Sequence, residues 1–332
     1  MSNYWKGKKV LITGADGFIG SHLAEQLVKK EADVRAFVYY NSFDSWGWID
    51  DFDEEVKARI DVFQGDIRDP SRVMDAVKGR EVIFHLASLI AIPYSYYAPD
   101  SYAQTNVYGA VNILNACRKH GVEKVVHTST SEVYGSAQYV PIDEKHPLQG
   151  QSPYAASKIG ADMFAKSFFL SYGLPVVTVR PFNTYGPRQS LRAVIPTILT
   201  QLLTGCQEIK LGALHPTRDF NFVLDTVSGF LALARCDSAI GNVVNVGSGR
   251  EISIADLVAL LFEITGVDGK IVCENGRLRP EKSEVDRLLC DASLAFELCG
   301  WHPDYTLEQG LAITVRWMKD HLKRFKSKRY AL

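Results

Sequence analysis

Two groups of side chains in the middle of this chain have the residue types and spacing of catalytic acids and bases. Tyr154 and Lys158 are four positions apart, so in a helix they would lie on one face, one turn from each other. A lysine ammonium beside a phenol stabilises the phenolate and lowers its pKa toward the range that a base needs near neutral pH. Thr130, Ser131 and Glu132 end an earlier β-branched stretch, and Glu132 could bring a carboxylate to the same site. The pattern predicts two bases, a tyrosinate and Glu132, acting on one substrate.

Each group also has a purely structural interpretation. A tyrosine and a lysine at this spacing are common on helix surfaces, and a glutamate after a strand often caps a turn. The surrounding elements favour catalysis. The stretch 125–130 is apolar and predicts a buried strand, and 154–172 predicts a helix. Open α/β sheets bind ligands beyond the carboxyl ends of their strands, where Glu132 would lie.

A glycine-rich turn near the start of the chain predicts a dinucleotide site. Lys9–Thr13 is a short apolar run, three glycines at spacing three follow it, and 21–30 has helical periodicity. Glycines between a strand and a helix allow a tight turn and close approach of a pyrophosphate. The free N–H groups at the helix start would then face the phosphates. The predicted cofactor contacts in this turn are Gly14, Gly17, Phe18, Ile19 and Gly20.

The end of the second strand bears on which dinucleotide is bound. An acid that grips the ribose 2′-hydroxyl of NAD is expected about 20 residues beyond the glycines. The predicted strand Asp33–Tyr39 is followed instead by Tyr40, Asn41 and Ser42. These three residues offer no acid to exclude a 2′-phosphate, and Asn41 and Ser42 could donate hydrogen bonds to it. The sequence therefore predicts NADP or NAD, with NADP slightly favoured.

The ends of later strands add further cofactor contacts. The strand 60–64 leads into Asp66, which could accept from the adenine amino group or cap a turn. The strand 82–86 leads into small residues that would let a cofactor lie across the strand end. The predicted contacts here are Asp66, Ile67, Leu86, Ala87, Ser88, Thr128, Tyr154 and Lys158.

Strands and helices alternate through most of the chain, which predicts an α/β fold with a doubly wound parallel sheet of the Rossmann type. After residue 187 the alternation gives way to short elements and loops rich in arginine. Guanidinium groups bind phosphate oxygens in pairs, so these loops suggest a diphosphate clamp. We expect residues 1–182, together with 220–247, to form the cofactor domain. Residues 183–219 and 248–332 would form a smaller C-terminal α/β substrate domain.

Composition excludes several classes of protein. The chain has 332 residues and a formal net charge of −1, from 37 basic and 38 acidic side chains. That balance predicts no nucleic-acid partner and no anionic membrane surface as partner. Six scattered cysteines without a CxxC pair predict free thiols rather than disulfides or a metal site. No apolar run approaches the roughly 18 residues of a membrane span, and the chain runs straight into its first strand without a signal-like segment. We expect a cytoplasmic protein.

These residues, in this order, resemble the extended short-chain dehydrogenase/reductase family, and within it the members that modify nucleotide sugars. The matching stretches are GADGFIG (14–20), GDI (65–67), HLAS (85–88), STSEVYG (129–135), YAASK (154–158), RPFNTYGP (180–187), RDFNFVLD (218–225), NVGSG (245–249) and RPEKSEVDRLLCD (279–291). The resemblance implies a nucleotide-sugar substrate and a tightly bound NAD(P) that is regenerated in each turnover. It also implies a homodimer formed through the helices 99–120 and 154–172. The implied substrate contacts are Ser95, Asn183, Arg192, Arg218, Asn245 and Arg279.

The stretch Thr130-Ser131-Glu132 resembles the 4,6-dehydratases, specifically their GDP-mannose branch, whereas simple 4-epimerases usually lack the acid. The stretches 40–50 and 90–109 resemble dehydratases of the legionaminic-acid pathway, which act on nucleotide-linked N-acetylglucosamine. In the implied reaction Tyr154 takes the proton of the sugar 4-hydroxyl while hydride passes from C4 to the cofactor, and Thr130 hydrogen-bonds the 4-oxygen. Glu132 then removes the C5 proton, water leaves from C6, and the hydride returns to C6. Ser131 is a poor acid, so Glu132 would also protonate the leaving hydroxyl.

Three other functions remain open from the sequence. UDP-glucuronate decarboxylases share the stretch STSEVYG, so a decarboxylase is the first alternative, followed by a nucleotide-sugar epimerase. A non-catalytic NADP-sensing regulator on the same fold is the third, although it would not need Thr130, Tyr154 and Lys158. The choice between UDP and GDP in the substrate also stays open.

Overall fold

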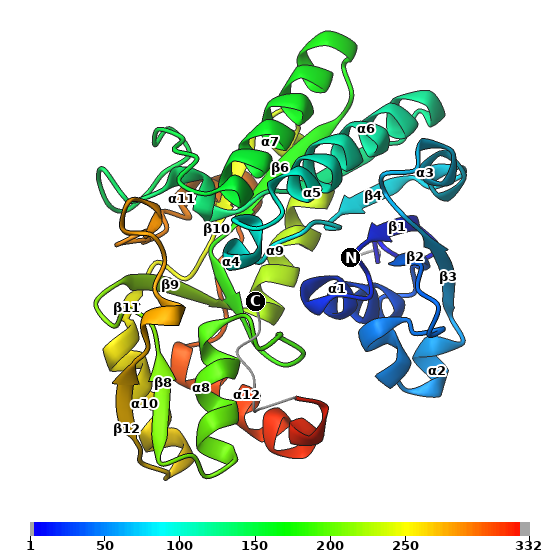
Figure 1. Ribbon diagram of the computed structural model, residues 1–332. Helices are drawn as coiled ribbons and strands as arrows, with labels where there is room; N and C mark the ends of the chain where they lie inside the picture. Colours follow the sequence, from blue (N-terminus) through cyan, green and yellow to red (C-terminus); the bar gives the residue numbers. More distant parts are fainter. Residues whose placement is uncertain (1–2, 326–332) are drawn as a thin grey trace.

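Seven parallel strands form one sheet that runs through the larger part of the molecule (Figure 1). The computed structural model describes residues 3–325 of the chain. The strand order is β10-β6-β5-β4-β1-β2-β3, and all neighbouring strands are parallel. The order reverses between β1 and β4, which is where doubly wound sheets open a crevice for ligands. The predicted Rossmann-type sheet is therefore confirmed. Its strands are β1 (Lys9–Thr13), β2 (Asp33–Tyr39), β3 (Ile60–Gly65), β4 (Val82–His85), β5 (Lys124–Thr128), β6 (Val176–Pro181) and β10 (Val243–Val246).

Helices cover both faces of this sheet because its strands are apolar on both sides. In β1, Val10 and Ile12 pack toward one face and Leu11 toward the other, as the two-residue period of a strand requires. The first face is covered by α1, α9 and α11, and the second by α3, α6 and α7. These helices are α1 (Phe18–Lys29), α3 (Pro70–Val77), α6 (Gly109–His120), α7 (Pro153–Tyr172), α9 (Val223–Arg235) and α11 (Ser293–Cys299), with the short α2 (Glu54–Lys57) beside α1.

The predicted helix 99–120 is interrupted by a π-helical segment. The structure has α5 (Pro99–Tyr102), a π-helix (Ala103–Tyr108) and then α6. The wider π turn places Asn106 inside the protein, where its side chain accepts from Leu89 N at 2.8 Å and donates to Leu89 O at 2.9 Å and to Ser157 Oγ at 2.9 Å. π turns of this kind often occur at functional sites. Here the turn ties the loop after β4 to the helix that carries Tyr154.

A smaller unit lies beside the carboxyl ends of the sheet strands and has its own apolar core. It contains a three-stranded sheet in the order β11-β9-β7 and a parallel pair of β12 and β8. Its elements are β7 (Asn183–Tyr185), α8 (Val194–Leu203), β8 (Glu208–Leu211), β9 (Thr217–Phe222), β11 (Glu251–Ser253), α10 (Ile254–Thr265), β12 (Lys270–Cys273) and α12 (Leu307–His321). The shorter elements that the site uses are α4 (Ile92–Ser95) and the 3-10 turns η1 (Gly47–Asp51), η3 (Ser131–Tyr134) and η7 (Leu322–Arg324).

The chain passes more than once between the two units. Helix α9 and strand β10 return to the larger sheet, whereas residues 220–222, which we also assigned to the cofactor domain, end β9 and lie in the smaller unit. A second difference concerns α11, which lies within the segment 248–332 that we assigned to the smaller domain. Ala295 of α11 is buried in the core that α1 and α9 share, so this helix covers the larger sheet. Residues 326–332 of that segment lie outside the described part of the chain. Among residues 3–325, no helix has both the length and the apolar character to span a bilayer.

Candidate active site

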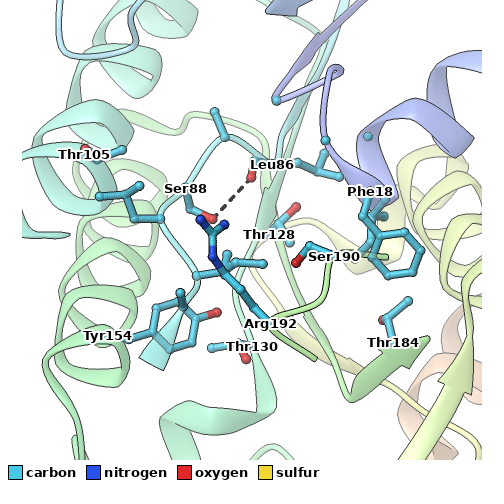
Figure 2. Close-up of a pocket in the computed structure, with 18 of the residues that line it drawn as sticks. Phe18, Leu86, Ser88, Thr105, Thr128, Thr130, Tyr154, Thr184, Ser190 and Arg192 are labelled. Atoms are coloured by element: carbon cyan, nitrogen blue, oxygen red, sulfur yellow. Dashed lines mark hydrogen bonds between the residues drawn. The ribbon is translucent and has the colours of Figure 1, made fainter. Parts of the chain in front are cut away.

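A cavity of about 760 Å³ opens beyond the carboxyl ends of the sheet strands, between the larger sheet and the smaller unit (Figure 2). It brings together the following predicted residues: Gly14, Gly17, Phe18, Ile19, Gly20, Asp66, Ile67, Leu86, Ala87, Ser88, Thr128, Thr130, Ser131, Glu132, Tyr154, Asn183, Arg192 and Arg279. Seven other predicted residues do not line it: Tyr40, Asn41, Ser42, Ser95, Lys158, Arg218 and Asn245.

The glycine turn is shaped to admit a phosphate-bearing ligand. Gly14 has a φ of 69°, and a Cβ on it would lie 2.9 Å from the Cα of Ala87. A Cβ on Gly20 would lie 2.1 Å from the carbonyl oxygen of Gly14. Only glycine fits at these two positions, because the turn passes directly over the exit of β4. Helix α1 begins at Phe18 with its N-terminus on this wall and no acid in its first turn, which leaves its positive end available for an anion.

Three polar atoms on the cavity wall indicate further contacts with a ligand. Thr128 Oγ1, Asn183 Oδ1 and Gln189 Oε1 are buried, and none has a hydrogen-bond partner among residues 3–325. Buried polar groups are almost always paired in folded proteins. A nicotinamide dinucleotide together with a sugar nucleotide would supply many donors to such acceptors. The cradle and these three atoms therefore fit the ligands that the motifs predict.

Tyr154 lies in the first turn of α7, where Ser152 caps the helix by accepting from Ala155 N at 3.1 Å. Lys158 follows one turn later, as the spacing predicts. Its ammonium donates to the carbonyl oxygen of Thr128 at 2.6 Å. Lys158 is buried behind the cavity wall rather than exposed on it, so it acts on the site through β5 and through its charge.

The prediction that Lys158 lowers the pKa of Tyr154 is not met in this structure. Burial raises the pKa of Tyr154 above its ordinary value, and hydrogen bonding to Thr130 only partly offsets that rise. Burial also lowers the pKa of Lys158 to about 8, with partial compensation from the charge of Asp162. Both shifts have the same physical cause, since an apolar environment disfavours the charged form of each group. Tyr154 is a neutral phenol until positive charge is brought closer to it.

Glu132 is a buried carboxylate on the cavity wall and not a surface cap. The capping role belongs to Thr130, whose hydroxyl accepts from Glu132 N at 3.2 Å. The side chain of Glu132 is only 10% exposed, and its Oε2 lies 3.8 Å from Nη1 of Arg279. Arg279 also lies 3.6 Å from Glu284 Oε1, which pairs with Arg218 at 3.3 Å. Two arginines and two glutamates thus alternate along this wall, and of the two arginines only Arg279 reaches the cavity.

Arg192 occupies a different part of the cavity. Figure 2 shows its side chain projecting between Tyr154 and Ser88, on the side where the proposed base lies. We expected Arg192 to bind the diphosphate. Its guanidinium lies beside Ser88 in Figure 2, on the same cavity wall as Tyr154.

The side chains of the loop after β2 that we expected to bind a 2′-phosphate lie away from the cavity wall. The side chain of Asn41 donates to the carbonyl oxygens of Tyr39 at 3.3 Å and Ser45 at 2.8 Å, and its Oδ1 accepts from Ser45 N at 3.3 Å. Its amide is therefore used to shape its own loop. The ground for favouring NADP is absent, because Tyr40, Asn41 and Ser42 all lie off the cavity wall.

Two implied substrate contacts also have structural roles. The Ser95 hydroxyl is buried and donates to Ile92 O at 2.7 Å within its own helical turn. Asn245 is fully buried; its side chain donates to Ile142 O at 3.0 Å and accepts from the Tyr134 hydroxyl at 2.7 Å. An asparagine that ends a sheet strand can face the ligand or the interior, and sequence spacing does not distinguish these cases.

Sequence reasoning missed two charged residues at the adenosine end of the cavity. Asp16, inside the glycine turn, lines the cavity and accepts from Tyr39 N at 3.2 Å. Arg68 lines it as well, and its Nη2 lies 2.5 Å from Asp66 Oδ2. The ion pair engages the carboxylate that we expected to accept from adenine. The sequence signal for Asp16 was its place between Gly14 and Gly17, two glycines of the cofactor motif.

A third missed residue, Asp162, lies one turn beyond Lys158 on α7. Its carboxylate accepts from Ser129 Oγ at 2.7 Å and from Arg180 Nη2 at 2.9 Å, and His127 Nε2 lies 3.2 Å away. Burial alone would raise the pKa of Asp162, but the contact with His127 and the charge of Arg180 lower it overall. Asp162 therefore joins the helix of Tyr154 to the end of β5 and to β6. The sequence signal for Asp162 was its place four residues after Lys158, which is itself four residues after Tyr154.

Replacing Asp162 tests this junction. We expect Asp162→Asn to lower the free energy of unfolding by about 3–5 kcal/mol, because it leaves the Arg180 charge buried and unpaired. The pKa of Asp162 is lowered in the folded protein, so its contribution is present above its unfolded pKa of about 3.9 and fades as the pH falls through the folded value. Urea denaturation at several pH values measures both effects. The matched control is Asp61→Asn, at an exposed pair with Arg35, which should cost less than about 1 kcal/mol. Equal losses for the two variants would contradict the assignment.

Known proteins resemble this chain over nearly its whole length. The family model described as GDP-mannose 4,6 dehydratase matches residues 11–314. A UDP-N-acetyl-alpha-D-glucosaminuronate decarboxylase of Bacillus cytotoxicus is 32% identical, over 94% of this chain and 98% of its own length.

Two solved structures have the same fold over nearly the whole chain. An epimerase from Methanothermobacter thermautotrophicus has a TM-score of 0.89 and 27% identity, and covers 98% of this chain and 96% of its own. A double mutant of a dTDP-glucose 4,6-dehydratase from Streptomyces venezuelae, solved with NAD bound, has a TM-score of 0.83 and 29% identity, and covers 96% of this chain and 99% of its own.

The family match spans most of the chain, and the relatives differ in reaction while sharing fold and motifs. The prediction of an enzyme is confirmed, and a dehydratase family model agrees with the predicted hydro-lyase class. The chain belongs to the extended short-chain dehydrogenase/reductase family of enzymes that modify nucleotide sugars.

Proposed function

We propose that this enzyme catalyses the NAD(P)-dependent 4,6-dehydration of a nucleotide-linked hexose, giving the 4-keto-6-deoxy sugar. The observation that carries the proposal is the buried carboxylate of Glu132, on the same cavity wall as Thr130 and Tyr154. Inversion at C4 needs only one base at the 4-hydroxyl. Elimination of water across C5 and C6 needs a second base at C5, and Glu132 is a carboxylate in the right surroundings for it.

A nicotinamide dinucleotide held by the glycine turn would supply the hydride acceptor and donor and a positively charged ring. Tyr154 removes the proton of the sugar 4-hydroxyl. Because burial raises its pKa, it needs positive charge nearby, and Lys158 supplies part of that charge below its own pKa of about 8. The hydroxyl of Thr130 accepts from Glu132 N and hydrogen-bonds Tyr154; it would donate to the 4-oxygen of the sugar once the substrate takes the place of that contact.

Glu132 performs the elimination. Oxidation at C4 acidifies the proton on C5, and Glu132 takes that proton. The neighbouring Ser131 is a poor acid, so protonated Glu132 passes the proton on to the 6-hydroxyl, which leaves as water. C5 then takes up the proton that Tyr154 removed from the 4-hydroxyl, as the bound cofactor would return the hydride to C6. Arg279, 3.8 Å from the carboxylate, balances the negative charge of Glu132 before the proton arrives.

The finer substrate assignment is nucleotide-linked N-acetylglucosamine, with UDP or GDP as the carrier. It rests on the resemblance of 40–50 and 90–109 to dehydratases of the legionaminic-acid pathway. Residues 89–94 support it, because they form a largely apolar wall of the cavity and its members Ile90 and Tyr94 are exposed at their positions. An acetamido methyl group would find apolar contacts on such a wall.

A decarboxylase is the second candidate, because Arg192 lines the cavity and its guanidinium, beside Ser88 in Figure 2, could pair with a sugar carboxylate. Mass spectrometry of products from UDP- and GDP-linked N-acetylglucosamine, glucose, mannose and glucuronate separates the reactions. Loss of water supports the proposal and loss of carbon dioxide supports the decarboxylase. An unchanged mass with an altered sugar indicates an epimerase. Absence of turnover with every sugar, despite cofactor binding, indicates a non-catalytic regulator.

Replacing the second base should separate the two halves of the reaction. In Glu132→Gln we expect C4 oxidation to persist, seen as reduced cofactor in single-turnover absorbance. Water loss should fall by about 10²–10⁴-fold, the usual contribution of a general base. Glu144→Gln is the matched control, since this carboxylate accepts from Asn245 N outside the cavity and should leave turnover unchanged. Normal turnover in Glu132→Gln would remove Glu132 from the mechanism.

For the cofactor we propose NAD rather than NADP. The ionisable side chains that line the adenosine end are Asp16, Asp66 and Arg68, which carry two negative charges and one positive. Burial raises the pKa of Asp16, so a phosphate dianion beside it would add to an already unfavourable charge. The dTDP-glucose 4,6-dehydratase of Streptomyces venezuelae was solved with NAD.

Titration calorimetry of both dinucleotides tests the cofactor proposal. We expect wild-type protein to bind NAD⁺ more tightly than NADP⁺. Asp16→Asn keeps an acceptor for Tyr39 N and removes the charge, so it should reduce that preference by about tenfold, equivalent to about 1.4 kcal/mol. Asp75→Asn, an exposed acid on α3, should leave the preference unchanged. Tighter NADP⁺ binding by wild-type protein would refute the proposal.

We also propose a homodimer through α6 and α7, which lie side by side at one edge of the molecule (Figure 1). Apolar and aromatic side chains stand exposed on α7, at Met163, Phe164, Leu170 and Tyr172. A second copy meeting this face across a two-fold axis would bury the same residues on both chains.

Light scattering after size exclusion tests the assembly. We expect a dimer for wild-type protein and a monomer for the double variant Met163→Glu with Leu170→Glu, because the interface would bury four unpaired charges. The control is Leu278→Glu, at an exposed apolar residue away from α7. A monomeric wild type would contradict the proposal.

A further inference from the structure

The segment 40–52, here called the β2 loop, has no role in the proposed reaction. It contains two tryptophans and ends in η1. The Asp50 carboxylate holds its shape by accepting from Trp46 N at 3.0 Å and from Ser45 Oγ at 2.9 Å. Ile49 and Phe52 anchor the loop in the core beneath α1. The loop is thus a built structure rather than a loose connection.

One side of the β2 loop rests directly on the glycine turn. Gly47 has a φ of 62°, and a Cβ on it would lie 2.4 Å from the carbonyl oxygen of Asp16. Trp48 N donates to that same oxygen at 3.1 Å. The carboxylate of Asp16, in turn, lines the cavity and accepts from Tyr39 N. The backbone of the phosphate-binding turn is therefore supported from outside by residues 47 and 48.

The other side of the β2 loop contacts the C-terminal end of α12. The rings of Trp48 and Trp317 meet edge to face, with centroids 5.4 Å apart. The guanidinium of Arg324 lies 5.1 Å from the centre of the Trp48 ring, and Arg324 also pairs with Asp51. Trp317 is backed by His321, stacked at 4.3 Å.

This contact joins the two units of the protein. Helix α12 belongs to the smaller unit, where Leu311, Val315 and Met318 are part of the apolar core. Its far end reaches the cofactor end of the larger sheet through Trp317 and, beyond the helix, Arg324. The sequence of contacts runs from the core of the smaller unit to Trp48, and from Trp48 to the backbone of Asp16.

We propose that Trp48, Trp317 and Arg324 form a clasp that retains the dinucleotide. They act as positioning residues: none of the three lines the cavity, and they hold the glycine turn in its binding conformation through Gly47, Trp48 and Asp16. A turn that is already ordered loses less conformational freedom on binding, so the cofactor binds more tightly and leaves more slowly. The inference rests on the proposed function only for the dinucleotide and not for the reaction on the sugar.

The clasp predicts a change in cofactor affinity from residues outside the cavity. We expect Trp317→Ala to weaken NAD⁺ binding about three- to tenfold, the range set by the coupling of one aromatic pair. Arg324→Ala should weaken it in the same direction, and Lys323→Ala, its exposed neighbour in η7, should not. Trp317→Phe should recover most of the affinity. Titration calorimetry and dilution-induced release of NADH, followed by fluorescence, measure affinity and off-rate in the full-length protein without any sugar.

Thermal unfolding and a double-mutant cycle distinguish positioning from packing. If the clasp positions the turn, Trp48→Ala and Trp317→Ala weaken NAD⁺ binding less than additively when combined. UDP and GDP binding to the same variants should change less than twofold. If Trp317→Ala lowers the melting temperature but leaves NAD⁺ affinity and off-rate unchanged, the proposal is overturned. Because sugar turnover is not measured, an incorrect reaction assignment would leave these outcomes unaffected.

Discussion

The buried carboxylate of Asp162 is the interaction on which the catalytic geometry depends. It lies on the same helix as Tyr154 and Lys158 and receives hydrogen bonds from Ser129 at the end of β5 and from Arg180 of β6. Thr130 follows directly after Ser129, and η3 carries Glu132. The charge of Asp162 therefore fixes the helix of Tyr154 relative to the turn of Glu132, the two proposed bases. Such a charge is tolerable in the interior because Arg180 and His127 accompany it.

The electrostatics of the cavity disfavour charge on both Tyr154 and Lys158. Burial keeps Tyr154 neutral by raising its pKa and brings the pKa of Lys158 down to about 8. A tyrosinate formed in the absence of cofactor would be a buried, poorly compensated anion. A bound oxidised nicotinamide would supply positive charge beside Tyr154 and so favour its phenolate. The clasp at Trp48 would then matter to catalysis indirectly, through the occupancy of the cofactor site.

The charge of Glu132, the proposed second base, is also balanced by side chains around it. Glu132 is nearly buried, and the alternation of Glu132, Arg279, Glu284 and Arg218 places each negative charge next to a positive one. A substrate diphosphate would compete with Glu284 and Glu132 for Arg279. The dehydratase, decarboxylase and epimerase relatives share this fold, so what distinguishes their reactions must lie in a few side chains around the hexose. Under the proposed function those in this chain are Ser131, Glu132 and Arg192.

Local patterns determined much of this protein without reference to its tertiary structure. The parallel sheet, the glycine turn and the pairing of Tyr154 with Lys158 follow from strand periodicity, from the sterics of glycine and from the turn of a helix. Each depends on residues close together in the chain. The same reasoning placed Thr130, Ser131 and Glu132 at the end of a strand and hence at the cavity.

Tertiary packing decided the rest, because a side chain's surroundings come from distant segments. Asn245 and Ser95 carry suitable groups, yet buried backbone carbonyls engage them. Asn41 shapes its own loop, whereas Asp16 reaches the cavity because β2 ends beside it. The pKa of Tyr154 could not be read from the nearby lysine, since the degree of burial sets the cost of its charge. Spacing along a helix or strand says which residues share a face, and only the folded chain says what that face meets.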